Sequence, residues 1–125
     1  MHKVFISQPM TGLSKEEILD TRLEAIEWVY KTLIENDFCR DDEIEIIDSY
    51  VEENQDKTDT TENLIYMLGT SIQLLSEAEI VYFCEGWENS RGCKVEHLVA
   101  EEYGLKFLST KKKNKVVNIS DTYIK

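Results

Sequence analysis

Long apolar runs are missing from this sequence. No apolar stretch among its 125 residues approaches the ~20 residues that a transmembrane helix needs. The N-terminus also lacks the basic segment, apolar stretch and cleavage site that mark a signal peptide. We therefore expect a cytoplasmic protein rather than a secreted or membrane-spanning one.

Cysteine is scarce, and the spacing of Cys39, Cys84 and Cys93 excludes two of its uses. An odd, widely spaced set is not a disulfide framework, and it lacks the paired close spacing of a zinc site. We expect free thiols in a reducing compartment. His2, expected to be exposed, and His97 add no metal-binding pattern, so we expect no metal.

Basic residues are few. Lys and Arg total 14 against 25 Asp and Glu, which gives a formal net charge of −11. Such a chain repels phosphate backbones and anionic lipid, so duplex nucleic acid and membranes are not expected as partners. Binding of a small neutral ligand, or of an anion held by a local basic pocket, stays compatible with this charge. The glycine motifs that bind nucleoside triphosphates and dinucleotides are also absent, and we expect no cofactor.

Strand patterns alternate with helix patterns along the chain. Helical spacing follows a Ser14–Glu17 capping box, and strands of consecutive apolar residues lie before and after it. Such alternation predicts right-handed β-α-β units, and hence one α/β domain over residues 1–125 with a mainly parallel sheet of four to five strands. The expected strands are 3–7, 43–48, 78–84 and 105–108, and the expected helices are 14–36, 60–76 and 92–103.

Two segments are harder to interpret. Residues 49–61 are polar and acidic without a period, which fits a solvated connector and a lid equally well. The tail 109–125 begins with a lysine run, and its residues 116–119 could form an edge strand or an arm.

One carboxylate falls on the expected buried face of the last helix. Residues three and four apart share a helix face, and Glu96 lies among small, apolar or aromatic neighbours on that face. A buried carboxylate is costly and often functional, because its surroundings set its pKa for use as a nucleophile or base. The alternative is a glutamate at the rim that pairs with Arg91, Lys94 or another chain. The residues sharing the face are Gly92, Val95, Glu96, Val99, Ala100 and Tyr103.

Loops that follow the strands are the expected ligand site, because parallel sheets bind ligands beyond the carboxyl ends of their strands. In the loop at 85–92, Trp87 could stack on a ring or simply pack, and Arg91 offers a cationic fork that could equally pair with an acid. Cys93, near a helix start, is either structural or a thiol of lowered pKa. The residues expected to bind substrate are Ser7, Gln8, Met10, Gly12, Gly86, Trp87, Glu88, Asn89, Ser90 and Arg91.

Two segments resemble a known family. The stretches VFISQPMTG at 4–12 and GWENSRGCKVEH at 86–97 are similar to the signatures of small phage and bacterial proteins related to nucleoside 2-deoxyribosyltransferases, the DUF4406 group. The resemblance implies a flavodoxin-like, Rossmann-like three-layer α/β/α sandwich, a homo-oligomer, and a bacterial or phage-infected cell. It also implies that Glu96 is the catalytic nucleophile, attacking the anomeric carbon of a deoxynucleoside.

Departures from that family keep several functions open. The helix segment YMLGT at 66–70 has no aspartate where the transferases usually carry one, and Glu88 stands in the loop instead of an aspartate. The expected function is cleavage of a nucleoside or nucleotide N-glycosidic bond, or 2-deoxyribosyl transfer, through Glu96. The alternatives are a non-catalytic binder of nucleotides or nucleotide-derived signals, and an oligomeric protein with a vestigial pocket.

Overall fold

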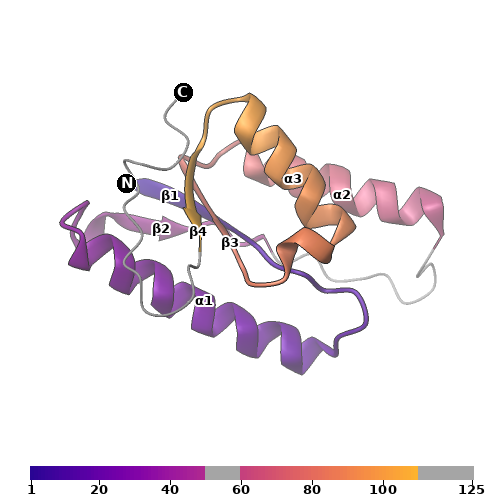
Figure 1. Cartoon of the computed structure of the whole chain (residues 1–125), viewed down its shortest axis with the longest axis horizontal. Coiled ribbons are helices and arrows are strands. Elements are labelled where there is room, and N and C mark those ends of the chain that lie inside the picture. Colours follow the sequence, from indigo (N-terminus) through magenta and orange to yellow (C-terminus); the bar gives the residue numbers. More distant parts are fainter. Residues whose placement is uncertain (50–59, 110–125) are drawn as a thin grey trace.

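Within residues 1–49 and 60–109, four parallel strands form one sheet in the order β2-β1-β3-β4 (Figure 1). The computed structural model describes residues 1–49 and 60–109 of the chain. Val4 of the inner strand β1 is in register with Ile46 on one side and Ile80 on the other. This strand order and the helices between the strands confirm the predicted flavodoxin-like α/β fold. The strands are β1 (His2–Ser7), β2 (Ile44–Ile46), β3 (Ile80–Phe83) and β4 (Lys106–Ser109).

The helices cover both faces of the sheet. Figure 1 shows α1 on one face and α2 with α3 on the other, which gives the predicted three layers. In the described part of the chain, single turns of 3₁₀-helix lie in two connections, η1 (Asp41–Glu43) and η3 (Trp87–Asn89). The α-helices are α1 (Lys15–Glu35), α2 (Thr61–Leu75) and α3 (Arg91–Glu102).

Side-chain caps fix where the helices begin. The capping box predicted for α1 is present: Ser14 Oγ accepts a hydrogen bond from the Glu17 N–H at 3.1 Å, and Glu17 Oε1 accepts one from the Ser14 N–H at 2.9 Å. Ser90 caps α3 by accepting from the Cys93 N–H at 3.3 Å. Because Ser90 is the cap, α3 begins at the residue that follows it.

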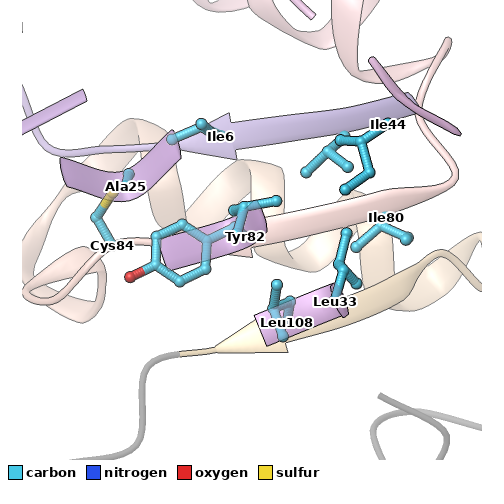
Figure 2. Close-up of a cluster of buried hydrophobic side chains, with 10 residues drawn as sticks. Ile6, Ala25, Leu33, Ile44, Ile80, Tyr82, Cys84 and Leu108 are labelled. Atoms are coloured by element: carbon cyan, nitrogen blue, oxygen red, sulfur yellow. The ribbon is translucent and has the colours of Figure 1, made fainter. Parts of the chain in front are cut away.

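The core lies on both faces of the central strands. Val4 and Ile6 of β1 pack with Ala25, Val29 and Leu33 of α1, and Figure 2 shows part of this cluster. The intervening Phe5 belongs to a second cluster on the opposite face, with Leu75, Val81, Phe83, Ala100 and Phe107. Burial on both faces explains why the strands are continuous apolar runs.

Some predicted details are wrong. Tyr103 is 81% exposed, because it is the C-cap residue where α3 ends and does not continue its buried face. His2 is half-buried, with its Nδ1 2.8 Å from Glu79 Oε1. The second strand begins only at Ile44, because Asp41–Glu43 form the turn η1.

Two further predictions lie outside the described residues: most of the loop at 49–61 and the edge strand or arm in the tail. Within residues 1–49 and 60–109, no helix has the length and apolar character needed to cross a bilayer.

Candidate functional site

A cavity of about 620 Å³ opens at the carboxyl end of β1. Its walls come from the loop after β1, Ile18 of α1, residues 64–71 of α2, and the first turns of α3. In the strand order of this sheet the chain leaves β1 for one edge and later returns to β3 on the other side. Such a reversal is where parallel α/β sheets commonly bind ligands.

Glu96 lines this cavity from α3. Only 6% of the residue is exposed, so the burial predicted from helical spacing is confirmed. Ser7 Oγ, at the end of β1, donates a hydrogen bond of 2.5 Å to Glu96 Oε1. Ser71 Oγ, on α2, donates one of 2.7 Å to Glu96 Oε2. The carboxylate is therefore held from two other elements and cannot rotate freely.

Burial controls the acidity of Glu96. Desolvation raises the pKa of its carboxyl above the ordinary value, and the hydrogen bonds from Ser7 and Ser71 oppose that rise. A carboxylate that is desolvated but still hydrogen-bonded is a better nucleophile or base than an exposed one. In this arrangement a single oxygen of Glu96 could act as the nucleophile or the base.

Apolar side chains make up much of the cavity wall. Side chains from the loop after β1, α1 and α2 form walls that could enclose a flat ring. Ser90 and Arg91 add a hydroxyl, a guanidinium and the N-terminus of α3 to the lining, a combination that favours anions. The apolar lining residues are Met10, Leu13, Ile18, Leu64, Ile65, Met67 and Leu68.

Six of the eleven predicted site residues line the cavity. Ser7 is not one of the lining residues, but its hydroxyl hydrogen-bonds to Glu96, which is. Gln8 lines it, but its Nε2 donates to the Ile18 carbonyl at 3.0 Å, so this amide also holds the loop against α1. The six lining residues are Gln8, Met10, Gly12, Ser90, Arg91 and Glu96.

The first half of the second loop lies elsewhere. Trp87 stacks on the imidazole of His97, with ring centroids 4.1 Å apart and planes 4° apart, and it also contacts Phe83. Glu88 and Asn89 are exposed, and Gly86 adopts a positive φ of 89° at the turn. Gly86, Trp87, Glu88 and Asn89 are not among the residues that line the cavity. Their predicted binding role stays a prediction without support from this geometry.

The surroundings of Cys93 contradict one of its two interpretations. Burial raises the pKa of its thiol, and the nearby Glu96 charge adds a smaller rise, so the interpretation as a thiol of lowered pKa is wrong and the structural one is retained. Hydrogen bonds with Ser7 and Ser90 oppose this rise but do not reverse it. Cys93 lines the cavity as a largely neutral group.

Sequence reasoning missed the contribution of α2. Leu64, Leu68 and Ser71 are four and three residues apart and all line the cavity from this helix. Ser71 is 8% exposed, a hydroxyl within a mostly apolar helix face. The pattern that pointed to Glu96, a polar side chain on an apolar stripe, was also available for Ser71.

The fold and the site together are those of a flavodoxin-like α/β domain whose cavity is lined by a buried carboxylate. In residues 1–49 and 60–109, no group of three or more His, Cys, Asp or Glu could hold a metal ion. Residues 54–109 match a family described as "Domain of unknown function (DUF4406)". The matched segment contains Ser71 and Glu96, and the match supports the resemblance to this family. Comparison with curated proteins gives no match.

Proposed function

We propose that the cavity binds a nucleoside or nucleotide and that Glu96 cleaves its N-glycosidic bond, by hydrolysis or by 2-deoxyribosyl transfer. The observation that carries this proposal is the position of Glu96. It is the buried carboxylate at the floor of a ligand-sized cavity, held by Ser7 and Ser71. A volume of about 620 Å³ is within the range of small-molecule sites, roughly 300–1,000 Å³.

The chemistry requires one nucleophilic oxygen. A Glu96 oxygen forms a bond to the anomeric carbon as the bond from that carbon to the base nitrogen breaks. The electron pair stays on the base, which takes a proton from water, and a glycosyl ester of Glu96 remains. Water then releases the sugar and restores the carboxylate, or a second base attacks the same carbon and completes transfer.

The cavity walls suit the two ends of such a ligand. The apolar side chains of α2 and of the loop after β1 could sandwich a base. Arg91, next to the start of α3, could hold the 5′-phosphate of a nucleotide. The rest of this acidic chain repels polyanions, which favours a monomeric ligand over a nucleic acid.

A non-catalytic binder is the second candidate. Both oxygens of Glu96 already accept hydroxyl hydrogen bonds, and burial favours the protonated form. A protonated Glu96 would recognise a ligand by hydrogen bonding rather than attack it. An oligomer with a vestigial pocket remains the third hypothesis, and the homo-oligomer stays a prediction.

The test is release of free base from a panel of nucleosides and their monophosphates, with ligand binding followed by thermal shift. We expect base release from at least one compound, and a loss of about a thousandfold or more in Glu96→Gln with binding retained. Binding without base release supports the second candidate. Neither binding nor release supports the third.

A further inference from the structure

A second, much smaller cavity is also lined by Glu96. Its volume is about 20 Å³, and Gln8, Met10, Ser71 and Glu96 line both it and the main cavity. The small chamber therefore adjoins the ligand cavity at these four residues, Glu96 among them. Phe5, Ile6, Arg22 and Ser49 complete its walls.

Arg22 brings a buried cation to this chamber. It is only 8% exposed on α1, where its hydrogen-bond acceptors are neutral: Ser49 Oγ at 3.1 Å and the Ile47 carbonyl at 2.8 Å. Ser49 in turn donates to the Ile6 carbonyl at 3.2 Å. A buried guanidinium is normally paired with a carboxylate. Asp48 acts on Arg22 through its charge without a direct hydrogen bond, and Glu96 is the carboxylate that lines the same chamber.

The chamber has the size and polarity of a water site. A cavity needs only about 10–15 Å³ to accommodate one water molecule, provided that two to four polar groups face it. Here the walls contain a guanidinium, a carboxylate, an amide and the hydroxyls of Ser49 and Ser71. A bridging hydrogen bond through such a water is nearly as favourable as a direct one.

We propose that one water molecule occupies this chamber and links the guanidinium of Arg22 to the carboxylate of Glu96, which makes Arg22 a positioning residue that keeps Glu96 ionised. Arg22 does not line the main cavity, so it acts through Glu96 and not on a ligand. The water and its contacts with Arg22 and Glu96 do not depend on the proposed function. Only the catalytic role of an ionised Glu96 rests on that function.

Other charged or titratable groups surround the pair, and their effects on Glu96 have to be distinguished from the effect of Arg22. Cys93 lies beside Glu96, and Arg91 is at the exposed side of the cavity. Asp48, exposed after β2, and the Cys84 thiol act on Arg22 and favour its charged form, against the desolvation that lowers its pKa. None of these four is altered in the variants below.

The experiment is an infrared pH titration of the Glu96 carboxyl in the full chain, assigned by its loss in Glu96→Gln. We expect Arg22→Met to raise the pKa of Glu96 by about one unit or more. Arg22→Lys, which keeps a cation, should restore part of the shift, whereas a purely structural role would make both variants alike. Arg40→Met, at an exposed arginine paired with Asp42 and Glu43, is the control and should leave the titration unchanged.

An unchanged Glu96 pKa in folded Arg22→Met overturns the inference. If that variant does not fold, a high-resolution crystal structure of the wild-type protein decides: it must show a water within hydrogen-bond distance of both Arg22 and Glu96, and a chamber without one overturns the proposal. Base release is scored separately. A chain that shows the Arg22 effect but releases no base refutes only the proposed function.

Discussion

Ser71 on α2 and Glu96 on α3 are joined by a buried hydrogen bond of 2.7 Å from the serine hydroxyl to the carboxylate. Since Ser7 holds the other oxygen, one carboxylate connects two helices to the end of β1. The polar floor of the cavity is thus also a structural contact between elements. Changes at the floor should therefore alter stability as well as ligand chemistry.

Replacing Ser71 by alanine tests this contact. We expect Ser71→Ala to lower the free energy of unfolding at neutral pH by about 2 kcal/mol, the scale of a hydrogen bond to a charged group, and to raise the pKa of Glu96. Urea denaturation measures the first effect and carboxyl titration the second. Thr70→Ala, which removes a hydroxyl bonded only to the Tyr66 carbonyl of its own helix, is the matched control and should change both little.

The raised pKa of Glu96 makes stability depend on pH in a specific direction. From the ordinary value of 4.5 up to the folded pKa, the native state binds more protons than the unfolded state. The free energy of unfolding contributed by this group therefore falls as pH rises through that window. Glu96→Gln removes the titration, so its stability relative to wild type should increase from pH 4 to pH 8. Equal differences at both pH values, measured by urea denaturation, would contradict the buried-carboxylate assignment.

Two glycines should respond to alanine with opposite signs. Gly86 has a φ of 89°, and a Cβ there would meet only Pro9 Cγ at 3.9 Å, so the cost of Gly86→Ala is backbone strain of about 1–2 kcal/mol. Gly69 lies inside α2 with no atom within 4 Å of an added Cβ. Gly69→Ala should therefore stabilise the protein by about 0.5–1 kcal/mol. Melting temperatures that shift in the same direction would refute the assigned conformations.

Thiol reactivity tests the burial of the cysteines. Burial raises the pKa of all three thiols, that of Cys84 to about 12, but Cys84 and Cys93 are buried whereas Cys39 is only half-buried. At pH 8 a thiol reagent should modify one cysteine per folded chain, Cys39, and reach the other two only in urea. Mass spectrometry of the modified peptides identifies the site. Rapid reaction of all three in the folded protein would show that the cavity floor is open.

Local patterns made much of the fold predictable. The capping box at Ser14, the apolar strands and the helical spacing around Glu96 depend on neighbours in sequence, and the structure has all three. The position of Trp87 was not predictable, because its stacking on His97 depends on the path of the loop and not on composition. The chamber at Arg22 depends on contacts among α1, the end of β2 and α3, which no local window contains.

The inner position of β1 has a consequence for synthesis of the chain. Both of its hydrogen-bonding neighbours come later in the sequence, β2 at 44–46 and β3 at 80–83. The apolar segment Val4–Ile6 is therefore made before any strand that can pair with it, and it stays a potential partner for other nascent chains until β3 has emerged. Pairing over such sequence separations also slows folding.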